Sequence, residues 1–196
     1  MNIVIIFNHP FEGSFCNAIL ESAINGLKKA KHSVDLIHLD KEGFNPVMSA
    51  EDLKGFKESK AVDPKVIAYK SRLENAEHLV FIFPIWWELM PAMTKGFIDK
   101  VIFPGVAYNY TKRGLMKKTF TGLNGITVIT TMNTPSVFYR LIFGNAIKKA
   151  FMLGTLGKLG YRNRKWIKLS MVKFVSQNKR EKWLLKISRY FEHLDR

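Results

Sequence analysis

The amino-acid sequence predicts a three-layer α/β protein built on a doubly wound, five-stranded parallel sheet. Strand-like and helix-like segments alternate along the 196 residues, and the strand-like segments are short, continuous apolar runs. Such runs are typical of parallel strands, which helices cover on both faces. No internal repeat, low-complexity tract or linker interrupts this pattern. We therefore expect residues 1–196 to form a single domain with right-handed crossovers.

Each element can be justified in chain order. Apolar runs mark the five expected strands at residues 3–7, 34–39, 78–83, 126–131 and 167–173. Apolar residues at helical spacing indicate helices at 15–27, within 44–64, at 66–76, from Pro91 onward and at 183–194. Gly96 lies inside the helix after Pro91, where it costs about 1 kcal/mol relative to Ala. We expect a compensating close contact at that glycine.

The cysteine content and the apolar runs exclude several classes of protein. Cys16 is the only cysteine, so the chain has neither an internal disulfide nor a CxxC metal site, and we expect no metal. Residues 1–7 lack the basic start of a signal peptide. No apolar run approaches the roughly 18 residues that span a bilayer. The sequence therefore predicts a soluble cytoplasmic protein.

Positive charge is concentrated in the second half of the chain. Residues 112–196 carry 19 Lys or Arg against 3 Asp or Glu, whereas residues 1–111 are nearly neutral. Such charge attracts anions, whether dinucleotide phosphates, nucleic acid or an acidic membrane. Many of the cations alternate with apolar residues, which is the usual pattern of a solvated face. No recognition motif accompanies them, so we expect no nucleic-acid partner. A weak contact between the last helix and anionic membranes stays open.

The loop after the first strand is suited to binding phosphate. Residues 8–17 read NHPFEGSFCN, and Ser14 stands where the N-cap of the first helix should be. The unpaired N–H groups of a helix start carry partial positive charge and form a phosphate-binding site. Ser14 and His9 can add hydrogen bonds. A simple capping serine beside an incidental histidine explains the same pattern about as well.

The segment after the third strand is the most informative part of the chain. Residues 83–110 read FPIWWELMPAMTKGFIDKVIFPGVAYNY, with Trp86 and Trp87 held between two prolines. Large aromatic side chains at the carboxyl end of a parallel strand lie where open α/β sheets bind ligands. Flat rings there suit a flat, conjugated ligand. The alternative, a cluster that closes the core, rarely places two adjacent tryptophans beside prolines and a charge.

The fourth strand ends in hydroxyl and amide side chains. Residues 130–135 read TTMNTP. These side chains, together with exposed backbone N–H groups, can hydrogen-bond the polar edge of a ring. An ordinary turn explains the stretch about as well.

These segments resemble the flavodoxin-like NAD(P)H:quinone oxidoreductases, the family of DT-diaphorase and the bacterial quinone reductases. Residues 83–108 match the family pattern FPLxWxxxPAxxKGxxDRVxxxGxAY over more than twenty positions. The first loop matches HPxxxSFxxA at His9, Pro10, Ser14, Phe15 and Ala18. The resemblance covers residues 1–160 well and implies a flavodoxin-like fold.

The resemblance assigns roles to residues of all three loops. The flavin-binding residues that it implies are His9, Ser14, Phe15, Cys16, Pro84, Ile85, Trp86, Trp87, Glu88, Thr130, Thr131, Met132 and Asn133. Tyr108 and Tyr110 are implied to lie near the substrate pocket and the contact between two subunits. Met132 and Asn133 replace two glycines of DT-diaphorase-like enzymes, and the family's active-site histidine is missing. Tyr139 is the remaining candidate for a catalytic residue. Cys16 itself has the character of a small packed residue.

The activity that the resemblance implies is that of a flavin-dependent oxidoreductase. It would transfer a hydride from NADH or NADPH to a flavin, and then two electrons to a quinone or similar aromatic acceptor. The signature favours FAD, with FMN as the alternative, and implies a homodimer. Two other classes stay open: a flavodoxin-type electron carrier and a membrane-associated regulatory flavoprotein subunit. The basic second half argues against the carrier, because such carriers are usually acidic.

Overall fold

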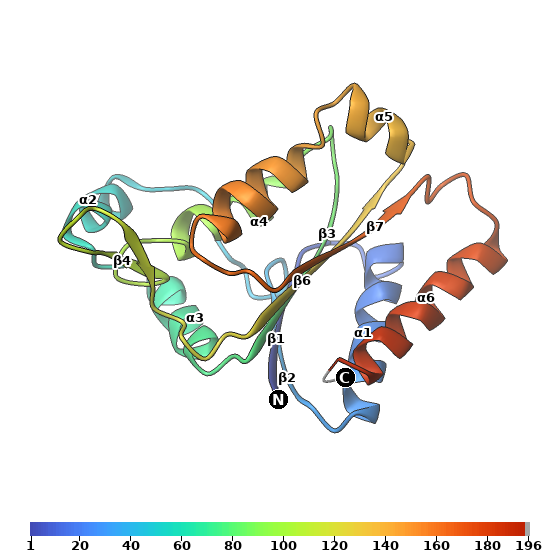
Figure 1. The fold of residues 1–196 in the computed structure, drawn as a ribbon, viewed down its shortest axis with the longest axis horizontal. Coiled ribbons are helices and arrows are strands. Elements are labelled where there is room, and N and C mark those ends of the chain that lie inside the picture. Colours follow the sequence, from blue (N-terminus) through green and yellow to red (C-terminus); the bar gives the residue numbers. More distant parts are fainter. Residues whose placement is uncertain (195–196) are drawn as a thin grey trace.

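The computed structural model describes residues 1–194 and confirms the predicted architecture. Five parallel strands form one sheet in the order β2-β1-β3-β6-β7 (Figure 1). Their bounds are β1 Asn2–Phe7, β2 Ser33–His38, β3 His78–Pro84, β6 Gly125–Met132 and β7 Arg164–Ser170. This order is the doubly wound arrangement of flavodoxin, in which ligands bind beyond the carboxyl ends of the strands.

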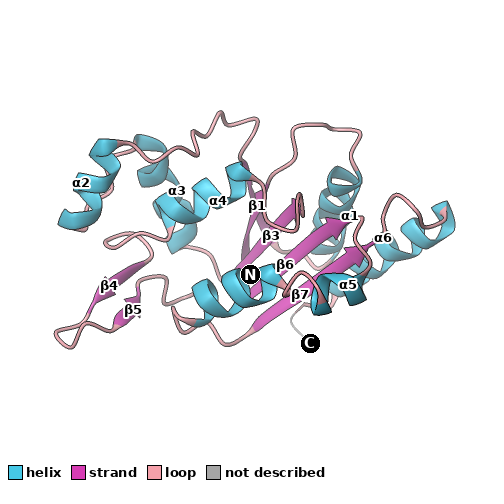
Figure 2. Ribbon diagram, turned by 90° about the horizontal axis from the view of Figure 1, so that it is seen from above, coloured by secondary structure: helices cyan, strands magenta, loops and turns pink. Residues whose placement is uncertain are grey.

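Helices cover both faces of the sheet and make it the middle layer (Figure 2). On one face lie α1 (Phe15–Lys29) and α6 (Gln177–Glu192). On the other lie α3 (Pro64–Glu74), α4 (Ala92–Val101) and η1 (Ile147–Gly157). Two shorter helices, α2 (Ala50–Glu58) and α5 (Ser136–Leu141), lie outside these layers. Because β1, β3 and β6 are buried on both faces, their sequences are continuous apolar runs.

The last helix packs on the first one. A Cβ at Gly26 of α1 would lie 2.2 Å from the carbonyl oxygen of Ser188 in α6, so glycine is required for the two helices to approach this closely. The hydroxyl of Ser22 donates to the carbonyl of Leu184 at 2.5 Å. Ile187 and Phe191 of α6 are buried against the sheet. Four cations of α6 are exposed on the side that does not pack, Lys179, Lys182, Lys186 and Arg189, whereas Arg180 is half-buried.

The close contact expected at Gly96 is present. A Cβ there would lie 2.3 Å from both the carbonyl oxygen and the Cβ of Pro46. The glycine thus lets α4 pack directly on the loop that follows β2.

A buried ion cluster fixes that region further. The Lys100 ammonium is 4% exposed and lies 2.6 Å from the Asp63 carboxylate and 3.3 Å from that of Asp52. Burial opposes ionisation of both carboxyls, but their hydrogen bonds outweigh it. Ser49 and Lys100 supply those bonds to Asp52, and Lys100 with a backbone N–H supplies those to Asp63. The pKa values of both carboxyls are therefore lowered. The cluster joins the start of α2, the cap of α3 and α4.

The structure corrects the bounds of the last strand and of the last helix, which begins at 177, and adds two short strands, α5 and η1 to the expected elements. The last strand runs from 164 to 170, not from 167 to 173, because Met171 adopts a positive φ of 59° that turns the chain out of the sheet. Tyr108–Tyr110 (β4) pairs with Met116–Lys118 (β5) in a separate antiparallel hairpin. The η1 segment is a π-helix, which apolar spacing does not distinguish from an α-helix. Among residues 1–194, no helix has the length and hydropathy needed to cross a membrane.

Candidate functional site

Three loops meet beyond the carboxyl ends of β1, β3 and β6. The ladder between β3 and β6 extends past the strands, because Ile85 N–H donates to the carbonyl of Thr131 at 2.7 Å. The thiol of Cys16, in the first turn of α1, lies 3.2 Å from the Thr131 hydroxyl. The segments singled out in the sequence are therefore brought together at one edge of the sheet.

The first loop ends in a capped helix start. Ser14 is the N-cap of α1, as expected, and its hydroxyl oxygen accepts from Asn17 N–H at 3.1 Å. The N–H groups of Phe15 and Cys16 open the helix, where no intrahelical acceptor is available. The first turn of α1 contains no acidic residue, so the partial positive charge of its end is not neutralised. These donors fit a phosphate group.

His9 joins this helix start to the tryptophan loop. Its Nδ1 accepts from Phe11 N–H at 3.1 Å, which leaves Nε2–H as the donor of the ring. Burial lowers the pKa of His9, so the imidazole is neutral at pH 7. The ring of Trp86 lies edge-on to it, with centroids 5.9 Å apart and planes 70° apart.

Residues 86–89 form a tight turn that carries both tryptophans. Trp86 N–H donates to Leu89 O at 2.9 Å, and Leu89 N–H donates to Trp86 O at 3.1 Å. The two central residues have positive φ, 49° at Trp87 and 63° at Glu88, as in a type I′ turn. Side chains other than glycine are strained in that conformation. The turn holds Trp86 47% exposed and Trp87 97% exposed, which excludes the alternative that they close the core.

Glu88 and its neighbours hold the turn in place. The Thr134 hydroxyl donates to Glu88 Oε1 at 2.5 Å, and the Tyr139 hydroxyl donates to the Glu88 carbonyl at 3.1 Å. The second carboxylate oxygen, Oε2, is buried and has no hydrogen-bond partner among the described residues. Strain that the surrounding structure imposes in this way is characteristic of functional sites.

The structure places Tyr139, the predicted catalytic residue, inside the protein. The side chain is fully buried, and its hydroxyl also accepts from Ile147 N–H at 3.0 Å. Burial raises the pKa of this phenol. With both hydrogen-bonding directions of its hydroxyl used inside the protein, Tyr139 links the Glu88 turn to the start of η1.

The side chains at the end of β6 face inward. The hydroxyl of Thr130 is buried and accepts from the indole N–H of Trp166 at 2.9 Å. Met132 is buried, and the amide oxygen of Asn133 accepts from Lys173 N–H at 3.0 Å. The side chains of residues 130–132 are thus occupied within the protein, and what the segment can offer a ligand is its backbone and the exposed side-chain amide of Asn133.

Cys16 is a packed residue, in keeping with its small size. The thiol is 2% exposed, and burial raises its pKa to about 11. Its neutral, inert form is therefore the one present at physiological pH. Its backbone N–H, not its sulfur, is the group available at the helix start.

The sequence did not single out Asn8, although it organises the site. Asn8 is 3% exposed and follows β1 directly. Its amide donates to Asp40 at 2.9 Å, and its amide oxygen accepts from the Thr94 hydroxyl at 2.8 Å. Asn8 therefore ties the first loop to β2 and α4. The sequence feature that could have identified Asn8 is a polar residue directly after an apolar strand.

Tyr108 and Tyr110 do not reach the three loops of their own chain. They lie on the β4–β5 hairpin near α2, whereas α5 lies in the opposite half of the molecule in both views (Figures 1 and 2). Tyr108 is buried and Tyr110 half exposed, with their rings 5.4 Å apart. Within one chain, the two tyrosines therefore do not lie next to the tryptophan turn of residues 86–89.

An apolar surface adjoins the site. It consists of exposed side chains on and after α5: Val137, Phe138, Leu141, Ile142 and Phe143. An exposed run of this kind is characteristic of an interaction surface. Among the described residues, no group of three His, Cys, Asp or Glu side chains could hold a metal ion.

Curated proteins similar to this chain include redox enzymes. An uncharacterized NAD(P)H oxidoreductase of Escherichia coli, YcaK, is 36% identical over 107 residues, which are 54% of this chain and 55% of that protein. NAD(P)H dehydrogenase (quinone) 1 of Rattus norvegicus is 29% identical over 152 residues, which are 69% of this chain and 55% of that protein. The chain thus spans about half the length of these curated relatives.

Solved structures match over nearly the whole chain. Smu.1420 of Streptococcus mutans has a TM-score of 0.85 and 32% identity, covering 98% of this chain and 99% of that one. An NAD(P)H:quinone oxidoreductase of Methanothermobacter marburgensis has a TM-score of 0.86 and 26% identity, covering 100% and 98%. A family model described as a flavodoxin-like fold matches residues 1–191. The chain therefore belongs to this flavodoxin-like family.

Proposed function

We propose that this protein is a cytoplasmic, single-domain flavoenzyme that oxidises NAD(P)H and reduces a quinone or a similar aromatic acceptor. The observation that carries the proposal is the tryptophan turn. It is strained, tied down by Glu88 and Tyr139, and placed against His9 beside an uncompensated helix start. The names of the relatives support the same chemistry, since they include NAD(P)H oxidoreductases and quinone reductases.

The helix start and His9 would hold the phosphate of the flavin. The N–H groups of Phe15 and Cys16 point along the α1 axis toward the loop, and Ser14 and His9 Nε2–H add hydrogen bonds. A neutral His9 donates one hydrogen bond without adding a full charge. The affinity of this site for the phosphate would therefore vary little with pH above the range in which His9 is protonated.

The tryptophan turn and the end of β6 would position the ring system. Pro84, Ile85 and the turn form one wall, and the backbone of residues 130–133 supplies polar groups along an edge. A bound flavin supplies the redox chemistry, accepting a hydride from NAD(P)H and passing two electrons to the acceptor. The protein contributes orientation, because both ligands would stack in turn against the same fixed surface.

The flavin itself is either FAD or FMN. The sequence signature favours FAD, whereas relatives whose names state a flavin are FMN-dependent, such as the NADH:quinone oxidoreductase of Macrococcus caseolyticus at 25% identity. Both share the ring and the first phosphate, which are the parts that the three loops fit. The mass of the flavin released from purified protein distinguishes the two.

A homodimer would complete the substrate pocket. The apolar surface of α5 lies beside the tryptophan turn, and Tyr108 and Tyr110 lie at the opposite end of the chain. Pairing two copies would bury the exposed apolar side chains and bring the tyrosines of one copy to the flavin of the other. Sedimentation velocity tests this arrangement, and a strictly monomeric active enzyme would contradict it.

The activity is tested by mixing purified protein with NADH or NADPH in a stopped-flow instrument. We expect a yellow preparation whose flavin absorbance bleaches with the nicotinamide and returns on addition of a quinone. A flavin that neither nucleotide bleaches would contradict the proposal and favour an electron carrier. A colourless protein that takes up neither FMN nor FAD would refute flavin binding altogether.

A matched pair of variants tests whether the start of α1 is the phosphate-binding site. Ser14 and Ser176 both cap helices through their hydroxyls, accepting from Asn17 and Lys179 N–H at 3.1 and 3.3 Å. Ser14→Ala and Ser176→Ala should each lower the stability of the protein without flavin by about 1 kcal/mol. Only Ser14→Ala should also weaken flavin binding, measured by fluorescence titration. Equal flavin affinities in the two variants would place the phosphate elsewhere.

A further inference from the structure

A second cavity, apart from the three loops, lies between η1 and the edge strand β7. It has a volume of about 580 Å³, within the range of small-molecule sites. Its walls come from α5, the start of η1, the loop before β7, and β7 itself. Because alternate residues of a strand point to the same side, Arg164, Trp166 and Lys168 all face it.

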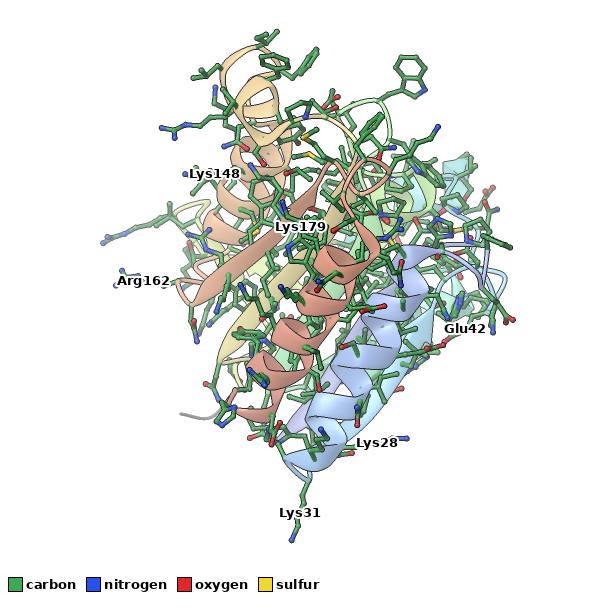
Figure 3. All side chains as sticks on the ribbon, turned by 90° about the vertical axis from the view of Figure 1, so that its right-hand side faces the viewer. Lys28, Lys31, Glu42, Lys148, Arg162 and Lys179 are labelled. Atoms are coloured by element: carbon green, nitrogen blue, oxygen red, sulfur yellow. The ribbon has the colours of Figure 1, made fainter. Side chains whose placement is uncertain are left out.

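Five cations line this cavity, and no carboxylate does. They are Arg140, Lys148, Arg162, Arg164 and Lys168. None of them forms an ion pair with a residue in the described part of the chain. Figure 3 shows Lys148 and Arg162 projecting on the same side of the molecule, away from α1. Like charges gathered without counter-charges repel one another, and an anion between them would relieve that repulsion.

The inner part of the cavity is rigid. The indole N–H of Trp166 donates to the buried hydroxyl of Thr130 at 2.9 Å. Arg164 donates to the carbonyl of Met152 in η1, so this guanidinium is fixed on the wall. The Lys168 ammonium lies 5.2 Å from the Trp166 ring centre and 5.7 Å from that of Tyr139. Burial, and then the charges of Arg140 and Lys148, lower the pKa of Lys168, as expected of a cation that lacks a counter-ion.

We propose that this basic cavity binds a phosphorylated small molecule with at least two negative charges, such as a nucleotide carrying a diphosphate. Five cations exceed what a single chloride or carboxylate would neutralise, and arginine and lysine are the side chains that recognise phosphate. The concave shape, bounded by four segments and open to solvent, suits a small molecule better than a membrane or a long nucleic-acid strand. The inference does not depend on the redox activity proposed above.

The first experiment measures binding of inorganic pyrophosphate to the flavin-loaded protein by calorimetry at 0.15 M NaCl. The test variant is Lys148→Gln with Arg162→Gln, two exposed cavity residues whose replacement leaves the core intact. The control is Lys28→Gln with Lys29→Gln, which removes the same charge at the far end of α1. We expect about one pyrophosphate per chain, tenfold or more weaker in the cavity variant and unchanged in the control.

Two results would overturn the proposal. One is that the unmodified protein binds no pyrophosphate at this salt concentration. The other is an equal loss of pyrophosphate binding in the cavity and control variants. That result would show that the affinity follows the net charge of the protein and not the cavity. Thermal unfolding of both variants verifies that they fold.

A second measurement identifies the source of the phosphate. If the ligand is NADH or NADPH, the cavity variant should show a higher KM for both nucleotides, because both carry a diphosphate. If a separate phosphorylated metabolite binds, both KM values stay constant while pyrophosphate binding is lost. A protein without NAD(P)H oxidase activity would leave the calorimetric result standing, so failure of the proposed function and failure of this proposal are distinguishable.

Discussion

Replacing Trp87 with glycine should make the protein more stable and less active. Trp87 has a φ of 49° and is 97% exposed, so its Cβ strains the backbone of the turn and its indole contributes almost no packing. A residue other than glycine in this conformation costs about 1–2 kcal/mol. Glycine removes that strain but adds about 0.4–1 kcal/mol of conformational freedom to the unfolded chain. The net expectation is a stabilisation of about 0.5–1 kcal/mol.

Trp87→Ala is the matched control, because alanine removes the indole and keeps the strain. A chain of this length gains about 2–4 °C of Tm per kcal/mol. We expect Trp87→Gly to unfold about 1–4 °C higher than the unmodified protein and Trp87→Ala to stay within about 1 °C of it. Circular dichroism on flavin-free protein measures this, because bound flavin would shift Tm by itself.

Both variants should lose acceptor binding equally. An aromatic contact is worth about 0.5–1.5 kcal/mol, which corresponds to a two- to tenfold higher KM for the acceptor. If Trp87→Gly were less stable than Trp87→Ala, the turn would not be strained as argued. An unchanged KM in both variants would show that the exposed indole has no part in binding.

Other predictions concern the buried charges and the thiol. Lys100→Met should cost about 3–5 kcal/mol in urea unfolding, because it leaves the buried Asp52 and the half-buried Asp63 without a counter-charge; a loss below about 1 kcal/mol would show that the cluster is solvated. The lowered pKa values of these aspartates mean that their contribution is complete above about pH 5 and is lost as pH falls through the folded values. Urea midpoints between pH 2 and 6 should show this loss in the unmodified protein and not in an Asp52→Asn, Asp63→Asn variant. Cys16, with its pKa near 11, should resist iodoacetamide at pH 8 unless the protein is unfolded; rapid labelling of the native protein would contradict its burial.

The sequence was sufficient to predict the sheet and its layers. Strands buried on both faces need apolar side chains along most of their length, so they can be identified in the sequence as apolar runs such as residues 78–83. Gly96 was informative for a similar reason, since a costly residue inside a helix implies a contact that requires it. The error at the end of β7 has a local cause. Residues 171–173 continue the mixed pattern of the strand, and the positive φ of Met171 has no signature in its side chain.

The candidate site was predicted less completely, because side-chain direction depends on tertiary structure. The tryptophans were expected at the right edge of the sheet, and their exposure agrees with a role in binding. The sequence did not reveal that Tyr139 is buried, because a tyrosine that follows a ligand loop has the same sequence context whether it faces inward or outward. Its neighbour Phe138 is the one exposed to solvent. The basic cavity could not be foreseen either, since its cations are spread from residue 140 to residue 168 and only the fold gathers them.

The position of β7 at the rim of the sheet has a consequence for handling the protein. A rim strand offers its unpaired backbone groups to any extended chain, and charged side chains along it deter such pairing. Arg164, Lys165 and Lys168 supply that deterrent here. A variant in which all three became apolar would invite strand-to-strand aggregation during expression. Loss of soluble yield in such a variant would therefore reveal nothing about what the cavity binds.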